Sequence, residues 1–251
     1  MTDILAVTRS LDERLPDLAR SVVRAHLEGA DPSTHDFLQS PDAREHHQTD
    51  WHQWGIITHT RVFMHHYEVD VPRYLKEWGL WQPVSSMLAE RIDGVGRGDL
   101  LRVAILLHDI GKFGARTRGK NRFHFSRHEE LSGRVIREEI DFDVYELTHA
   151  QIEYIAMTAE DHFVLGQVRK RAREDGAYGT DFVRGHRFLA IVREIRNEHP
   201  RDFVEIGVLF LGDSLAKADP ACGPERAVRQ YYINIDLAHA YLNVVLGNGQ
   251  S

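Results

Sequence analysis

The stretch "DLLRVAILLHDIGK" (99–112) joins an aliphatic run to an abrupt polar end. Its apolar density predicts a buried helix over 99–110, with Asp99 as the N-cap and Gly111 just beyond the last turn. His108 and Asp109 stand at the C-terminal end of this helix. Burying either side chain alone among leucines would be costly, so the pair requires a compensating partner.

Helical spacing of apolar residues recurs along the rest of the chain, and alternating strand patterns are nearly absent. We therefore expect an all-α fold, with roughly eight to ten helices packed around one core. The predicted helical ranges are 3–28, 55–69, 71–92, 99–110, 129–140, 148–163, 179–198, 201–219 and 224–246. Pro16 is expected to kink or split the first helix, and Thr148 is a candidate cap.

Three segments are predicted from these patterns. Residues 1–50 form an N-terminal helical extension that ends in a polar linker over 30–50. Residues 51–222 form the main domain, and residues 223–251 a C-terminal helix that packs on it. The first segment carries no motif, so capping of the domain and formation of a homo-oligomer both stay open as its role.

Charge and composition exclude several classes of protein. The chain has 251 residues and a formal net charge of −7, which disfavours bulk nucleic-acid binding. Its single cysteine, Cys222, rules out an internal disulfide and fits a reducing cytoplasm. We expect no signal peptide, because the N-terminal stretch has no apolar core of sufficient length, and we expect no membrane span, because no apolar run is long enough. The 16 histidines hint at metal binding.

Two further polar residues interrupt apolar helices. His59 lies in "IITHTRVF" and Asp213 in "IGVLFLGDSLA". Taken singly, His59 would be an ordinary core histidine, and Asp213 could pair with Lys217 one turn later. Together with the His-Asp pair, however, they form a nitrogen and oxygen ligand set for one shared divalent cation. Such a set suits Mn²⁺, Fe²⁺, Zn²⁺, Co²⁺ or Mg²⁺.

The motifs "HDIGK" (108–112), "HT" (59–60) and "LGDSLAKA" (211–218) resemble the HD-domain superfamily of metal-dependent phosphohydrolases. The family pattern H…HD…D falls on His59, His108, Asp109 and Asp213, in the family's order. The resemblance covers roughly residues 55 to 220 and implies a helical HD-domain core. It also implies one or two divalent metal ions and a catalytic role for Asp109.

Many members of this family add two histidines that hold a second metal ion. "RHEELSG" (127–133) and "AEDHF" (159–163) resemble the segments that supply them, which implies His128 and His162 as ligands and Asp109 as the bridge. His124 competes with His128, four residues earlier. The remaining candidates are expected to occupy ordinary surface or core positions: His65, His66, His149, His186 and His199.

A basic loop follows the His-Asp pair. Lys112 is fixed relative to Asp109, and we expect it to act in catalysis by neutralising a phosphate oxygen. The other candidates for substrate binding are Arg116, Arg118, Lys120, Arg122, His124 and Arg127. Arginines suit bidentate contacts with phosphate, although each of these could equally belong to a solvated turn.

The resemblance implies a phosphohydrolase that cleaves a phosphomonoester or phosphodiester, of nucleotide type, with a metal-activated water. The partner would then be a small anionic substrate that contains phosphate. The alternative is an HD-fold di-iron oxygenase, because the same ligands hold two irons in some family members. A degenerate domain that only senses a ligand is a third reading. The "HDxxED" and "HHE…GYP" signatures of two nucleotide-hydrolysing subfamilies are absent.

Overall fold

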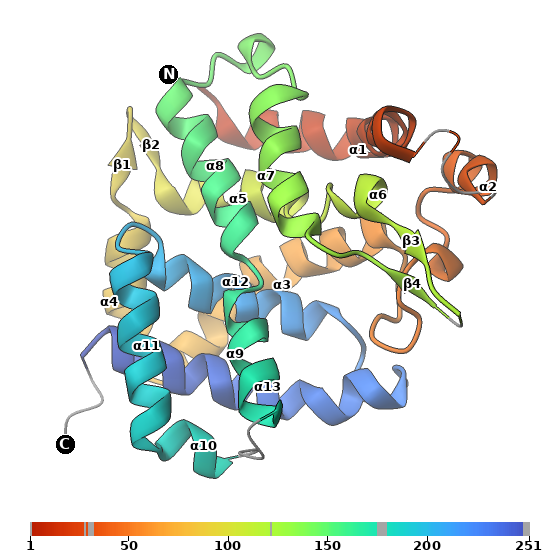
Figure 1. Ribbon diagram of the computed structural model, residues 1–251. Helices are drawn as coiled ribbons and strands as arrows, with labels where there is room; N and C mark the ends of the chain where they lie inside the picture. The colour runs from red at the N-terminus through yellow and green to blue at the C-terminus, as the bar shows by residue number, and fades with distance from the viewer. Residues whose placement is uncertain (1, 28, 30–32, 121, 175–179, 248–251) are drawn as a thin grey trace.

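The computed structural model describes residues 2–27, 29, 33–120, 122–174 and 180–247 (Figure 1). Its longer helices are α1 (Ile4–Leu27), α3 (Ile56–Glu77), α5 (Arg97–Leu107), α7 (His128–Glu138), α8 (His149–Asp161), α9 (Val164–Glu174), α11 (His186–Glu198), α12 (Phe203–Ala216) and α13 (Glu225–Val245). The shorter ones are α2 (Thr34–Gln39), α4 (Trp81–Leu88), α6 (Lys112–Ala115) and α10 (Thr180–Arg184). Single 3₁₀ turns are η1 (Arg44–His46) and η2 (Asp143–Tyr145).

Two small antiparallel hairpins accompany the helices. Strand β1 (Arg91–Ile92) pairs with β2 (Val95–Gly96), and β3 (Thr117–Arg118) pairs with β4 (Phe123–His124). The second hairpin lies in the basic loop. The predicted all-α class is therefore confirmed, with short helices dividing the chain more finely than expected.

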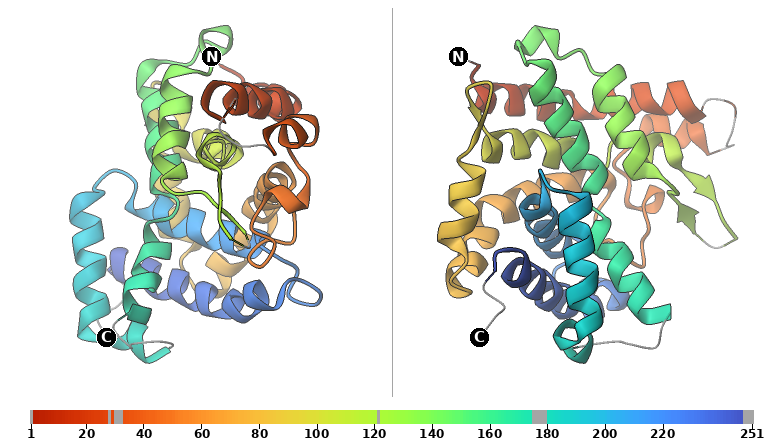
Figure 2. Two further views of the ribbon diagram at one scale, coloured as in Figure 1. Left: turned by 45° about the vertical axis from the view of Figure 1, so that its right-hand side comes forward. Right: turned by 60° about the vertical axis from the view of Figure 1, so that its left-hand side comes forward.

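Helices α5 and α12 form the centre of the molecule. Every residue of α12 from Val204 to Ala216 is buried, because α3 and α13 pack along it. Helix α5 packs against α8, α3 and α1, and α7 lies alongside α8 (Figures 1 and 2). The candidate ligand residues lie on or directly next to these core helices, which gives them a rigid support.

The N-terminal segment belongs to the same core. Helix α1 packs against α5 and α6, and Phe37 of α2 is fully buried against the ring of Phe113. Residues 33–50 of the predicted linker therefore pack closely on the molecule, whereas its residues 30–32 lie outside the described residues. This packing brings histidines from the segment towards the HD pair.

Two helices continue through internal prolines. Pro16 lies inside an uninterrupted α1, and α3 continues through Pro72 to Glu77. An internal proline costs about 3 kcal/mol, but α3 has buried residues on both sides of it, Val71 before and Leu75 after. Of the kink or split expected at Pro16, the split is therefore wrong, and so is the predicted boundary between the helical ranges 55–69 and 71–92.

Helix ends follow local chemistry. Thr148 caps α8 in a reciprocal capping box with Gln151, as predicted. Helix α5 begins at Arg97, so Asp99 lies in its first turn, where its carboxylate pairs with Arg102. Among the described residues, no helix combines the length and the apolar character that crossing a bilayer requires.

Candidate metal centre

Six side chains converge at the ends of the core helices. They are the residues that the sequence singled out as ligands: His59, His108, Asp109, His128, His162 and Asp213. Helix α3 supplies the first, and the end of α5 supplies the HD pair. Helices α7, α8 and α12 supply the remaining three in chain order. All six are buried, so their polar atoms need partners within the cluster.

Asp109 lies at the middle of the cluster. Its Oδ2 atom is 3.2 Å from His108 Nε2 and 3.7 Å from His59 Nε2. Its Oδ1 atom is 3.3 Å from His128 Nε2 and 3.8 Å from His162 Nε2. Each carboxylate oxygen therefore faces two imidazoles, and the side chains form two trios that share Asp109.

The four imidazoles are oriented by backbone carbonyls. His108, His128 and His162 each direct Nδ1 at the carbonyl oxygen three residues earlier, at 2.7–2.8 Å. His59 Nδ1 reaches the carbonyl of Ala216 at 3.2 Å. A carbonyl accepts only from an N–H, so the proton of each neutral ring belongs on Nδ1. The Nε2 lone pairs then face the carboxylates, which is the usual arrangement for histidine ligands of a metal.

Burial disfavours the protonated form of two of the imidazoles. It lowers the pKa of His162 to about 3, with a further contribution from His108, and it lowers the pKa of His59 as well. Burial would raise the pKa of Asp109, but His108 and Lys112 outweigh it and hold this pKa well below its ordinary value. Burial therefore favours the neutral form of His59 and His162, while the carboxyl of Asp109 stays ionised.

This donor set fits a divalent cation. Within the described part of the chain, His108 Nε2 and Asp109 Oδ1 are buried and have no hydrogen-bond partner. In addition, His59 Nε2 lies 3.0 Å from Asp213 Oδ1, although its ring proton is already directed at Ala216. Acceptors that face one another in a buried site are stabilised by a cation between them.

Gly111 permits the close approach of α7 to the HD turn. A Cβ atom at this position would lie 2.2 Å from the carbonyl oxygen of His128. Its N–H donates to Ser132 Oγ, which in turn donates to the carbonyl of His108. The backbone of Gly111 has an ordinary right-handed conformation. The requirement for glycine therefore comes from the close contact with α7, and not from a special backbone conformation at the helix end.

Lys112 bends back onto Asp109. Its Nζ donates to Asp109 Oδ2 at 2.7 Å and to His47 Nε2 at 3.2 Å. His47 Nδ1 is directed at the carbonyl of Trp54, which leaves Nε2 as the acceptor for the lysine. His47 therefore fixes the position of Lys112.

His47 and His52 are site residues that sequence reasoning missed. The His52 ring stacks on His47 and meets the edge of His59, with ring centroids 3.8 and 4.8 Å apart. Its Nδ1 atom is buried without a hydrogen-bond partner among the described residues. The only signal was the density of histidine in "REHHQTDWHQW" (44–54), a stretch without a helical pattern.

A cavity of about 780 Å³ opens beside the cluster. His128, His162 and Asp213 line it, together with four of the predicted substrate-binding residues: Lys112, Arg122, His124 and Arg127. His124 lines the cavity wall, whereas His128 lies 3.3 Å from Asp109. Of these two histidines, His128 is therefore the neighbour of the central carboxylate. Sequence reasoning missed three further cations on the wall: Arg169, Lys170 and Lys217.

Three cations of the basic loop lie elsewhere. Arg116 is 1% exposed, and its guanidinium lies 3.9 Å from the ring centroid of Phe37 and 4.5 Å from that of Phe123. It also donates to Ser33 Oγ, so it joins the N-terminal segment to the β3–β4 hairpin. Arg118 and Lys120 are on this hairpin and are not among the cavity-lining residues. The structure gives Arg116 a packing role.

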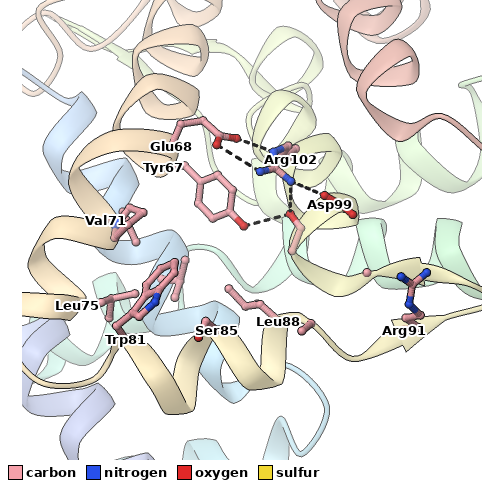
Figure 3. Close-up of a pocket in the computed structure, with 15 residues that line it drawn as sticks. Tyr67, Glu68, Val71, Leu75, Trp81, Ser85, Leu88, Arg91, Asp99 and Arg102 are labelled. Carbon is pink, nitrogen blue, oxygen red and sulfur yellow. Dashed lines mark hydrogen bonds and ion pairs between the residues drawn. The ribbon is translucent and has the colours of Figure 1, made fainter.

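A second cavity, of about 610 Å³, lies at the opposite end of α5 (Figure 3). Its polar wall consists mainly of Glu68, Asp99, Arg102 and the hydroxyl of Tyr67. Arg102 pairs with both carboxylates, and the hydroxyl donates to the carbonyl of Gly98. None of the clustered ligand residues lines this pocket.

Comparison with known proteins identifies the domain. The family model of the HD domain matches residues 84–204. This range holds the ligand candidates from His108 to His162, whereas His59 and Asp213 join them only through the fold. A search of the curated proteins found no match. Clustered histidines and aspartates of this kind accord with divalent metal binding. Residues 84–204 thus match the HD domain, which is typical of a superfamily of metal-dependent hydrolases, and the cluster is compatible with the metal site of such a domain.

Proposed function

We propose that this protein hydrolyses a phosphomonoester or phosphodiester bond of a small, nucleotide-type substrate. The observation that carries the proposal is the position of the Asp109 carboxylate. Four imidazole Nε2 atoms surround this carboxylate, and the cluster lies next to a cavity lined by lysines and arginines. A site of this kind can hold both divalent cations and the anionic group on which they act.

The proposed metal ligands are His59, His108, Asp109, His128, His162 and Asp213, with Asp109 shared between two positions. When bound, divalent ions at these positions would supply Lewis acidity towards a phosphoryl oxygen and towards the attacking water. The protein's contribution is to hold the rings in one tautomer and to keep both carboxylates ionised. The pKa of Asp213, like that of Asp109, stays low despite burial, here because of Lys217 and His59.

Cations on the cavity wall would bind the phosphate. Lys112 and Lys217 lie closest to the carboxylates, where each donates to one of them. Arg122 and Lys170 lie further out on the wall. Phosphoryl transfer depends mainly on positioning and charge stabilisation, and residues held in this way supply both.

Aromatic rings support a nucleotide-type substrate. Trp51, Phe125 and Phe163 line the same cavity as the cations. Arg169 and Arg226 lie over the Trp51 ring, at 5.4 and 4.2 Å from its centroid. A flat ring beside a phosphate-binding wall matches a nucleobase joined to its phosphate. His52 would donate or accept a hydrogen bond at the reacting group through its unpartnered Nδ1.

Two measurements test the proposal. The first is the metal content of protein purified without added metal. The second is phosphate release from a panel of nucleotides, together with cleavage of bis(p-nitrophenyl) phosphate, by the metal-loaded protein. Activity that depends on Asp109 is the expected result. Two irons per chain, with O₂ consumption and no phosphate release, would instead favour the di-iron oxygenase.

A further inference from the structure

A second cluster of ligand-type side chains lies behind the end of α8. Asp161 is the last residue of that helix, His199 follows α11, and Asp202 precedes α12. His199 Nδ1 is 2.8 Å from Asp161 Oδ2 and 4.0 Å from Asp202 Oδ1. One ligand atom from each residue lies within 4.8 Å of the other two. Three segments that are distant in sequence thus bring two carboxyls and an imidazole together.

Asp202 is the unusual member of this cluster. Its side chain is 1% exposed, and its Oδ2 atom is buried without a hydrogen-bond partner among the described residues. Burial and the nearby Asp161 carboxylate both raise the pKa of Asp202. Two facing carboxyls with an unpartnered oxygen need either a proton or a cation between them.

The arrangement suits a cation. We propose that Asp161, His199 and Asp202 form a second divalent-cation site, distinct from the cluster around Asp109. Its mixed nitrogen and oxygen set is that of Zn²⁺ or Mn²⁺ sites. The side chains of Asp161 and His199 are 19% and 22% exposed, so water can complete the coordination.

The position of the site indicates a structural role. Asp161 directly precedes His162, whose Nε2 faces Asp109. A cation on Asp161 would tie the end of α8 to the turn between α11 and α12. The site would thereby hold His162 in place without contacting the substrate cavity, because none of its three ligands lines that cavity.

Metal counting on the full chain tests this site. Protein dialysed against Zn²⁺, and separately against Mn²⁺, would be measured by elemental analysis. We expect His199→Gln and Asp202→Asn each to bind one ion per chain fewer than the wild type. Asp109→Asn should retain the ion that those two variants lose. Equal metal content in the wild type and in His199→Gln would overturn the proposal.

A matched control and a second readout keep the test independent of folding. His66 Nδ1 pairs with Asp70 Oδ2 at 2.7 Å and at similar exposure, but His66 joins no ligand trio among the described residues. His66→Gln should therefore leave the metal count unchanged. Thermal unfolding without metal should show Asp202→Asn at least as stable as the wild type, since one buried carboxylate is removed. A less stable variant with an unchanged metal count would show that a shared proton holds the pair, and would reject the cation.

Discussion

The two ends of helix α5 border two cavities with opposite polar chemistry. At its N-terminal end, the guanidinium of Arg102 forms ion pairs with both carboxylates of the pocket wall, Glu68 and Asp99 (Figure 3). At its C-terminal end, His108 Nε2 and Asp109 Oδ1 are buried without hydrogen-bond partners within the described residues. Buried polar groups are normally paired, so unpaired ones mark the place where a ligand is needed. The two cavities have similar volumes, and they differ in whether the polar groups beside them have partners.

Removing the central carboxylate should have the largest effect. Asp109→Ala deletes the group that both trios share, and we expect loss of metal from the cluster and a fall in hydrolysis of roughly 10³-fold or more. Helix content should remain close to that of the wild type in circular dichroism. Full metal occupancy of the central cluster in this variant would contradict the site assignment.

A methyl group at Gly111 should strongly destabilise the protein. The new Cβ would lie 2.2 Å from a backbone oxygen that cannot easily move, so we expect Gly111→Ala to cost about 3 kcal/mol of unfolding free energy. Gly98→Ala is the matched change at the other end of α5, where the nearest atoms are 3.4 Å away. Denaturant unfolding should place it within about 1 kcal/mol of the wild type. Equal losses of unfolding free energy in Gly111→Ala and Gly98→Ala would contradict this difference between the two ends of α5.

Added metal should raise the unfolding midpoint mainly by binding at the C-terminal end of α5. At a free metal concentration one hundred times Kd, a single site contributes about 2.7 kcal/mol. We expect the unfolding midpoint of the metal-stripped wild type to rise on adding Mn²⁺ or Zn²⁺. In Asp109→Ala most of this rise should disappear, whereas Arg102→Met should keep it. A rise of the same size in Asp109→Ala would locate the stabilising metal elsewhere.

Loss of the histidine that holds Lys112 should have a moderate effect. His47→Leu removes the acceptor of the lysine and leaves the ring ligands in place. Residues that support a metal site from the next layer typically contribute about 10-fold or more to activity. We expect a fall of about that size in kcat/KM on the best phosphate substrate. An unchanged kcat/KM would remove His47 from the site.

The smallest effect is expected in the pocket of Figure 3. Arg102→Met breaks two partly exposed ion pairs, which together contribute about 1 kcal/mol or less. Hydrolytic activity should stay within twofold of the wild type. A large loss of activity would show that the paired end of α5 also takes part in function.

Most of the helical architecture could be predicted from the sequence, because apolar spacing within a helix is a local property. The errors occurred where tertiary packing overrode a local rule. Helix α3 does not end at residue 69 as expected, because its buried stripe continues at Val71 and Leu75. The segment around Phe37 looked like a linker, yet its few apolar and aromatic side chains pack against α1 and α6.

The sequence by itself determined the all-α class and the ligand types, because a His-Asp pair at the end of an apolar helix needs a polar partner wherever that helix packs. It also determined the order of the six candidates along the chain. The tertiary structure decided which histidines reach Asp109, why Gly111 must lack a side chain, and that His47 and His52 border the cluster. Such contacts join residues far apart in sequence, as with His59 and Asp213, which are separated by 154 positions. These distances are set by the packing of the helices, and they cannot be predicted from the spacing of residues within one helix.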